Sequence, residues 1–341
     1  MPATLSDPAV LRREVARFQR PALFEGLSQI VTSFGGFFAT CAAMYVLAGV
    51  SYWLVPLLAP LAGGFLMRIF VIQHDCGHGS FLRSRRANAA IGFACSVLTM
   101  TPFPSWRRQH AGHHNTWNDL DHRDVADMYS ACITVAEYRA LSPRQRIWYR
   151  ITRNPIFANV ILPPFIFTLL YRTPFDLPRS WGYERRAIHF TSLGLVAGLG
   201  GVGLLLGFAD VLVVQLSAVA FAAIVGSWMF SVQHRADRTH WRRHEDWNRV
   251  SASLDGTTYF RLPAVLNWFT GNIGFHHVHH LNPAVPNYRL RACHHRIAPF
   301  HDVQTLSLRS AFRALRFTLW DEEARAMTTF RAAGHQTAQH P

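Results

Sequence analysis

The stretch that decides the fold is LSQIVTSFGGFFATCAAMYVLAGVSYWLVPLLAPLAGGFLMRIFVI, residues 27–72, in which Arg68 is the only charged side chain. Residues 188–230 are comparably apolar, and Asp210 is their only charged side chain. A transmembrane helix needs about 20 mostly apolar residues, so each stretch can hold two spans and a short turn. Apolar core helices of a soluble enzyme are the alternative, but such helices are seldom this long without charge. We therefore expect an all-α integral membrane protein with four transmembrane helices in two hairpins, over residues 27–50, 52–73, 187–207 and 211–231.

The net charge of +14 comes with a consistent placement of arginine. Arginines flank the four expected spans, at positions 12, 13, 17, 20, 83, 85, 86, 185, 186, 235 and 238. Neither expected turn, around Val50 or around Phe208, contains an arginine. The positive-inside rule then places both turns outside, and the termini and remaining segments in the cytoplasm, as in a bacterial inner-membrane protein. Nucleic-acid binding is the weaker interpretation, because no recognition motif accompanies the charge.

The remaining segments are expected to form one domain with the spans, over residues 1–341. A polar N-terminal helix should begin at Asp7-Pro8, with Asp7 as its cap. Residues 87–103 and 156–171 are apolar but short for a span, and topological parity favours interfacial or re-entrant elements. Residues 308–341 are expected to form a polar helix and a tail. The five cysteines are scattered without a CxxC pair, so no structural disulfide is expected.

Histidine is concentrated in three clusters beside these spans. The first is HDCGH, residues 74–78, in which an i, i+4 spacing puts two imidazoles on one helical face. The second is HAGHH, residues 110–114, and the third is HHVHH, residues 276–280; both contain an i, i+3, i+4 pattern. His234 adds a single histidine at the end of the fourth span. One such motif is often packing or surface, but three on one side of a membrane indicate a metal site.

The number of histidines limits the kind of metal site. A single zinc ion takes about four ligands and would leave most of this set unused. Eight or nine imidazoles suit two ions of a first-row metal, and imidazole accepts iron, copper, nickel or zinc. Ligand type alone therefore leaves the metal open.

These three boxes, in this order around two hairpins, resemble those of the integral-membrane fatty acid desaturases. The run RIFVIQHDCGHGSF, residues 68–81, is similar to the family's approach to its first box. TGNIGFH, residues 270–276, together with VPNY, residues 285–288, resembles the third box of the bacterial acyl-lipid Δ12/ω6-like branch. Tyr149-Arg150 and Arg153-Asn154-Pro155 also fit, and the resemblance extends over about residues 20 to 300.

The resemblance implies four spans with a cytoplasmic helical cap that holds a non-haem di-iron centre. It implies O2-dependent removal of two vicinal hydrogens from an acyl chain, which leaves a cis double bond. The ligands that it implies are His74, His78, His110, His113, His114, His234, His276, His279 and His280.

Three further residues are expected to support these ligands. Asp75 and Asn272 are candidates to orient imidazoles or hold a water, although helix capping and a turn explain them equally well. His277 is expected behind the ligands or on the surface, and a local shift could exchange it with His276.

The electrons are expected from a separate protein. The chain has no His-Pro-Gly-Gly haem motif and no flavin or nicotinamide fingerprint, so we expect no haem, flavin or NAD in this chain. An acidic ferredoxin steered to the arginine-rich cap is the natural donor.

Two rival functions remain open at this point. A relative could use the same histidines to hydroxylate or ketolate a lipid, an alkane or a carotenoid. A non-catalytic membrane metal-binding protein, such as a transporter or sensor, would require ionisable residues along a path through the spans. Only Arg68 and Asp210 meet that requirement, and both lie near span ends.

Overall fold

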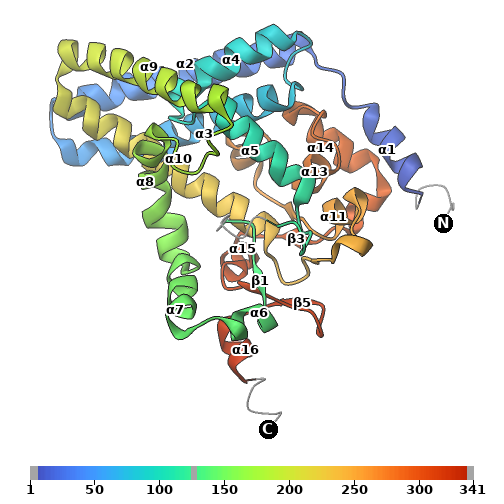
Figure 1. Ribbon diagram of the computed structural model, residues 1–341. Helices are drawn as coiled ribbons and strands as arrows, with labels where there is room; N and C mark the ends of the chain where they lie inside the picture. The colour runs from blue at the N-terminus through green and yellow to red at the C-terminus, as the bar shows by residue number, and fades with distance from the viewer. Residues whose placement is uncertain (1–6, 124–128, 336–341) are drawn as a thin grey trace.

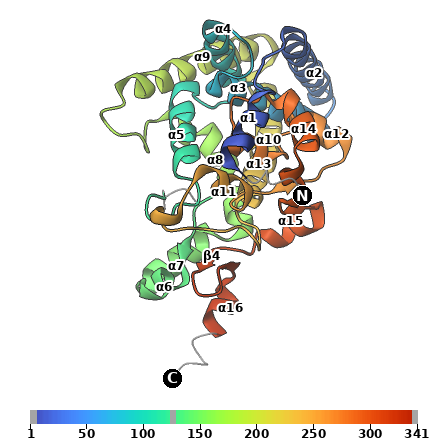
Figure 2. The same ribbon diagram turned by 90° about the vertical axis from the view of Figure 1, so that its right-hand side faces the viewer.

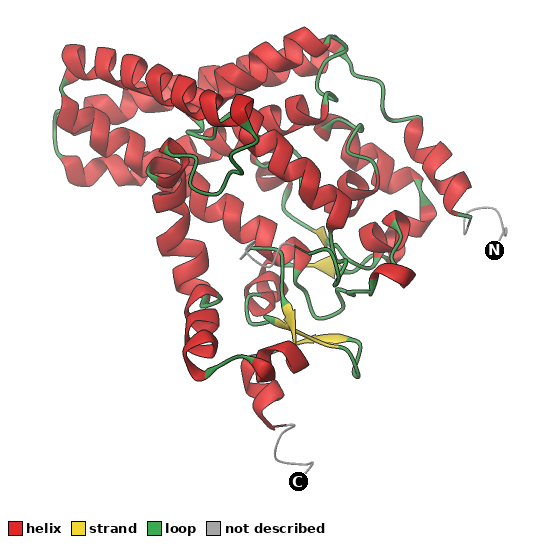
Figure 3. Cartoon of the chain, in the orientation of Figure 1, coloured by secondary structure: helices red, strands yellow, loops and turns green. Residues whose placement is uncertain are grey.

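Four long helices form the bundle at the upper left of Figure 1. The computed structural model describes residues 7–123 and 129–335, and most of them are helical (Figure 3). Each long helix is long and apolar enough to cross a membrane, as the sequence predicts. They are α2 (Leu23–Ala48), α3 (Ala59–His78, preceded by the 3-10 turn η1, Tyr52–Leu58), α9 (Gly182–Leu206) and α10 (Phe208–His234).

The helices α3 and α10 extend beyond the ends predicted for their spans. The apolar pattern predicts ends at residues 73 and 231, but α3 continues to His78 and α10 to His234. Gly79 then ends α3 in the left-handed region, at φ 71°, a conformation that costs glycine little. His74, His78 and His234 are therefore carried on the rigid ends of spanning helices.

Close packing between α3 and α10 fixes the relative position of these two ends. A Cβ atom on Gly63 of α3 would lie 2.7 Å from the Phe221 ring of α10, so glycine permits the approach. Ile69 and Ile72 of α3 and Val214 of α10 are fully buried in the core between the long helices. Such a core resists displacement of either helix, because interiors are packed about as densely as organic crystals.

The two shorter apolar segments form helices beside the bundle. The first contains α4 (Arg85–Leu98), a 14-residue helix that begins at the Ser84 cap and packs against α3 and α9. The second contains a π-turn η2 (Phe157–Ile161), α8 (Leu162–Thr168) and the 3-10 turn η3 (Leu170–Arg172). Together with α7 (Pro143–Thr152) it forms a helical pair bent by 52°, and α7 and α8 run crosswise to the bundle in Figure 1. An interfacial or re-entrant position remains the prediction for both segments.

The cap forms at the end of the bundle where α3 and α10 terminate. Its N-terminal helix α1 (Pro8–Ala16) is capped as predicted, since the Ala9 N–H donates to Asp7 Oδ1 at 2.8 Å. Leu11 and Val15 of α1 pack into the same apolar cluster as Val278, near α13 and α14 (Figure 2). The other cap helices between the spans and the C-terminal region are α5 (Phe103–Thr116), α6 (Val135–Ala140), α11 (Arg249–Leu254), α12 (Ala264–Phe269), α13 (His276–Leu281) and α14 (Asn287–Arg296), with the 3-10 turns η4 (His244–Asp246) and η5 (Ala298–Asp302).

The C-terminal region corrects the prediction that residues 308–341 form a polar helix and a tail, because strands follow a short helix there. The helix α15 (Leu308–Ala314) is followed by the strands β4 (Leu319–Asp321) and β5 (Ala326–Thr328) and by α16 (Phe330–His335). The strand β4 pairs in parallel with β1 (Ile133–Thr134) and antiparallel with β5. A second small sheet joins β2 (Tyr259–Phe260) to β3 (Thr305–Leu306).

The physical reason for the correction is burial of Trp320. This side chain is 2% exposed and packs in a cluster with Trp117 and Trp241, so the segment adds a sheet to the cap. Residues 336–341 of the predicted tail lie outside the described residues. All five cysteines are buried as free thiols.

Candidate metal centre

Four elements bring the nine predicted histidine ligands together at the cap end of the bundle. The end of α3 carries two of them, α5 carries three, the end of α10 carries one, and α13 carries three. They are His74 and His78, then His110, His113 and His114, then His234, then His276, His279 and His280. Within this set, the short contacts between ring nitrogens fall into two groups.

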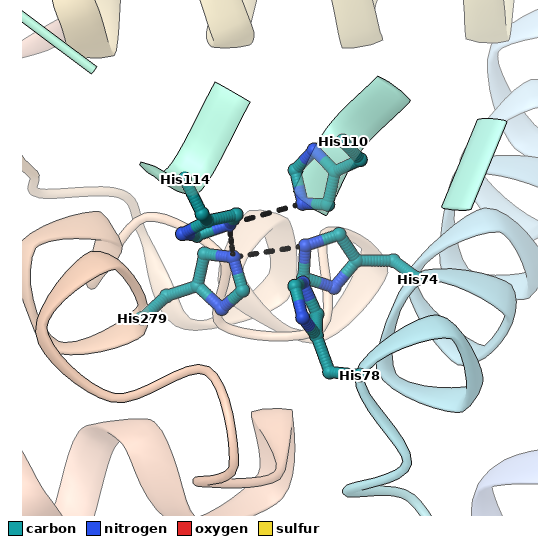
Figure 4. Close-up of side chains that lie close together, drawn as sticks. All are labelled: His74, His78, His110, His114 and His279. Atoms are coloured by element: carbon teal, nitrogen blue, oxygen red, sulfur yellow. Dashed lines mark hydrogen bonds between the residues drawn. The ribbon is translucent and has the colours of Figure 1, made fainter. Parts of the chain in front are cut away.

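The first group contains five histidines whose ligand atoms all lie within 4.8 Å of one another. The Nε2 atom of His279 lies 3.0 Å from Nε2 of His74 and 2.9 Å from Nε2 of His114. His114 Nε2 is in turn 3.1 Å from Nε2 of His110. Figure 4 shows these rings, with that of His78, turned toward a common point from α3, α5 and α13.

The second group is centred on His234 of α10. Its Nε2 atom lies 3.0 Å from Nε2 of His113, 3.0 Å from Nε2 of His280 and 3.1 Å from Nε2 of His276. The ligand atoms of His113, His234 and His280 lie within 4.8 Å of one another. Since His113 and His114 are adjacent on α5, and His279 and His280 on α13, the two groups are direct neighbours.

Hydrogen bonding cannot account for the contacts around His234. The Nδ1 atom of this ring lies 2.6 Å from the carbonyl oxygen of Phe230, so Nδ1 carries the proton and Nε2 has only a lone pair. One ring lone pair accepts one N–H donor, yet three other Nε2 atoms surround it. A metal ion explains the arrangement, because two nitrogens at about 2.1 Å from one ion and at right angles lie about 3.0 Å apart.

Burial and charge also favour a cation between these rings. Burial, followed by repulsion between neighbouring imidazoles, lowers the pKa of His110, His114, His276, His279 and His280 well below 6.5. The rings are therefore neutral at pH 7 and keep the lone pairs that metals bind. The buried Nε2 atom of His78 has no hydrogen-bond partner among the residues that the structure describes. The donor set thus fits first-row metal ions.

Asp75 orients one of these imidazoles through a buried network. Its Oδ1 atom accepts a hydrogen bond of 3.0 Å from Nδ1 of His74, which leaves His74 Nε2 free to face the cluster. The other oxygen, Oδ2, accepts from the backbone N–H of Asn287 at 2.6 Å and from Nδ2 of the same residue at 2.9 Å. The expected orienting contact of Asp75 is therefore present.

Asn272 contacts Asn287 and not an imidazole. Its side chain donates to the carbonyl oxygen of Asn287 at 3.3 Å and makes no hydrogen bond to a histidine within the described part of the chain. The residue adopts φ 58°, in the left-handed region that asparagine tolerates, four residues before the start of α13. The turn, which the sequence offers as the alternative role of this residue, accounts for its position.

His277 points away from the two groups, although it lies between His276 and Val278. It is fully buried, so the surface alternative is wrong, and its Nε2 atom lies 3.0 Å from Nδ1 of His294. Its ring also packs near Phe300. Successive residues on a helix are about 100° apart, so His276 and His277 cannot face the same point. The structure turns His276, and not His277, toward the cluster.

Two tryptophans beside the cluster were not expected from the histidine pattern. Trp106 stacks on His110 with ring centroids 4.6 Å apart, and Trp117 packs edge-on against His234 at 4.3 Å. Trp106 precedes His110 by four residues on α5, so helical spacing could have identified it. Trp117 follows the helix, and only the fold brings it to His234.

An apolar cavity of about 200 Å³ opens onto the cluster from the bundle. Its walls include His74, His110 and His276 at one end and apolar or small residues of α3, α8 and α10 elsewhere. These other residues include Leu66, Phe167, Val219, Ala222, Ala223 and Gly226. A cavity that connects spanning helices to a metal-binding cluster suits a long apolar ligand.

Comparison with known proteins identifies the class that this fold and site define. Residues 51–311 match the family model described as fatty acid desaturase. The chain is 37% identical over 325 residues to a fatty acid desaturase of Bacillus subtilis, with 95% of this chain and 91% of that protein covered. It therefore belongs to the fatty acid desaturase family.

Two proteins of a Synechocystis species are more distant relatives. The chain is 27% identical over 256 residues to its sn-1 oleoyl-lipid 12-desaturase, with 71% and 68% of the two chains covered. It is also 27% identical over 286 residues to its sn-1 acyl-lipid omega-3 desaturase (ferredoxin), with 79% and 76% covered. With four helices long and apolar enough to cross a membrane and a histidine-rich cluster that can hold metal, this protein is a fatty acid desaturase, an oxidoreductase of a family that uses a lipid substrate and oxygen.

The adjacent histidines His276 and His277 provide a test of the metal centre. We expect His276→Gln to hold less metal than the wild type, because it removes a nitrogen from the second group. His277→Gln should keep the wild-type metal content, since its ring contacts His294. Metal per chain is measured by plasma mass spectrometry on purified protein of verified helical content. Equal losses in both variants, or a loss in His277→Gln alone, would contradict this assignment.

Proposed function

We propose that this enzyme inserts a cis double bond into an acyl chain of a membrane lipid, with two iron ions held by the nine histidines. The single observation that carries this proposal is that the apolar cavity ends at His74, His110 and His276. We also propose that the protein lies in a bacterial inner membrane with the cap in the cytoplasm. Arginines at the cap ends of the four spans support that orientation.

The cavity residues position the substrate. Leu66 lies eight residues before His74 on α3, which corresponds to about 12 Å along the helix, well inside the span. Ala222, Ala223 and Gly226 are small residues in one wall of the cavity, so they leave room for an extended methylene chain along α10. The depth of the cavity then decides which two carbons reach the histidine end.

The protein's own groups prepare the site for redox chemistry. Iron ions held by these histidines would supply the chemistry that activates O2, with electrons from the external donor, and removes hydrogen from two adjacent methylene groups. The carboxylate of Asp75 holds the proton on His74 Nδ1, and the Phe230 carbonyl does the same for His234, so that Nε2 of each ring faces the centre. The apolar walls around the chain exclude water from the reacting carbons.

An acidic ferredoxin is the proposed electron donor. The Synechocystis omega-3 relative carries ferredoxin in its name, which supports the same class of donor here. The net charge of +14 favours association with an acidic protein, through long-range attraction that weakens as salt rises.

Product analysis tests the proposed reaction. The chain is expressed with a ferredoxin and its reductase in a host without polyunsaturated lipids, and fatty acid methyl esters are analysed by mass spectrometry. We expect a new unsaturated acid, and loss of at least about 100-fold in the His279→Ala variant, because His279 contacts both His74 and His114. The exposed His295→Ala serves as the matched control and should retain activity.

Two outcomes would overturn the proposal. An alcohol or ketone as the main product would assign the site to hydroxylation or ketolation. Unchanged lipids beside an active control desaturase would argue against desaturation of these substrates, and normal activity of His279→Ala would contradict the ligand assignment.

The cavity wall provides a second prediction. Ala222→Phe should fill the cavity and reduce product formation by at least about tenfold or move the double bond, because a buried ring occupies the space of several methylenes. The control is Ala197→Phe, the same substitution on the exposed face of α9. Product amount and bond position are read from dimethyl disulfide adducts. Identical product profiles for wild type and Ala222→Phe would exclude this cavity as the acyl site.

A further inference from the structure

A second cluster of metal-binding side chains lies outside the nine histidines. Asp119 and His122 belong to the loop that follows α5, and His244 begins η4 after α10. The Nδ1 atoms of His122 and His244 lie 2.9 Å and 2.7 Å from the same oxygen, Oδ2 of Asp119. The two imidazole centroids are 4.2 Å apart, and the three potential ligand atoms lie within 4.8 Å of one another.

The carboxylate of this cluster is held in a fixed orientation. Asp119 is 3% exposed, and its other oxygen, Oδ1, accepts hydrogen bonds from the backbone N–H groups of Asp121 at 3.0 Å and His122 at 3.3 Å. These bonds direct Oδ2 toward the two imidazoles. Little conformational entropy is then left to lose when Oδ2 takes a ligand.

Backbone pairing holds the two contributing segments side by side. The N–H of Leu120 donates to the carbonyl oxygen of Arg242 at 2.8 Å, and the N–H of Arg242 donates to that of Asn118 at 3.1 Å. The three side chains are therefore brought together by the fold before any ion binds. This arrangement differs from a chance meeting of flexible surface groups.

The two imidazoles are exposed to solvent, whereas the carboxylate is buried. The His122 and His244 side chains are 53% and 61% exposed, against 4% for the Asp119 side chain. A cation bound to Oδ2 and the two Nδ1 atoms would face water on its open side. Each ring would then carry its proton on Nε2 in place of Nδ1, which requires only tautomer exchange with solvent.

The charges around this cluster favour a cation in an otherwise basic protein. Arg243 contacts Asp121 at 2.7 Å and Glu322 at 2.9 Å, and Arg242 contacts Asp255 at 2.7 Å. With Asp119, four carboxylates thus accompany two guanidinium groups.

We propose that Asp119, His122 and His244 form a separate Zn²⁺ site on the surface of the cap. Two imidazoles and one carboxylate are three of the ligands that zinc takes, and water supplies the fourth. The ion would fasten the loop after α5 to the segment after α10, the two helices that carry His113, His114 and His234. The site does not depend on the proposed desaturation, because it shares no ligand with the nine-histidine cluster.

Zinc stoichiometry on the full chain tests this proposal. Detergent-purified protein, loaded with iron, is dialysed against buffered Zn²⁺, with Mg²⁺ in a parallel sample, and bound metal is counted by mass spectrometry. We expect wild type to bind one more Zn²⁺ per chain than the His122→Gln/His244→Gln variant, and no corresponding Mg²⁺, since imidazole suits zinc and not magnesium. Asp119→Asn should weaken this zinc by more than about 100-fold.

A matched control variant distinguishes a specific zinc site from non-specific binding of zinc to exposed histidines. His295→Gln/His301→Gln removes two exposed histidines elsewhere on the cap and should keep the additional zinc. Zn²⁺ should also raise the thermal unfolding midpoint of wild type and of this control, but not that of His122→Gln/His244→Gln. Equal zinc in wild type and His122→Gln/His244→Gln, or equal losses in both double variants, would overturn the proposal. Either result is read without an activity assay, so it is distinct from failure of the desaturase proposal.

Discussion

The crowding of imidazole nitrogens is the constraint on which the rest of this structure depends. Three Nε2 atoms lie within 3.1 Å of Nε2 of His234, whose only ring proton is already donated to Phe230. Each buried polar atom left without a partner costs about 1–3 kcal/mol, so such a cluster disfavours the cap unless a cation is present. Metal binding and folding of the cap are therefore expected to be coupled.

The long helices provide the rigidity that this crowding requires. The ends of α3 and α10 carry histidines from both hairpins into one cluster, and the close approach at Gly63 fixes the two helices against each other. The helices α5 and α13 then close the cluster from the cap side. The same packing leaves an apolar cavity between α3, α8 and α10, whose walls include His74, His110 and His276 of the cluster.

Much of this arrangement could be predicted from the sequence because its signals are local. Stretches of more than 40 residues with a single charged side chain predict hairpins, and histidines at i, i+3 and i+4 predict shared helical faces. The role of Asp75 could be predicted in the same way, since this residue adjoins His74 within the first histidine box. The nine histidines expected as ligands lie together in the structure. Their spacing in the sequence could identify them, but it could not show where they meet in space.

The features that the sequence did not predict depend on non-local contacts or on backbone conformation. Trp320 occupies a strand because it packs with Trp117 and Trp241, which are distant in the chain. Asn272 adopts a positive φ in a turn, one of the two roles expected for it, and no periodicity in the sequence could decide between them. His277 differs from His276 only in its direction from α13, which depends on the register of a six-residue helix.

The most direct test of the central claim is anomalous diffraction at the iron edge from crystals of the iron-loaded protein. The account predicts two peaks per chain, one among His74, His78, His110, His114 and His279, and one among His113, His234, His276 and His280. A single peak, or iron bound away from these nitrogens, would contradict it.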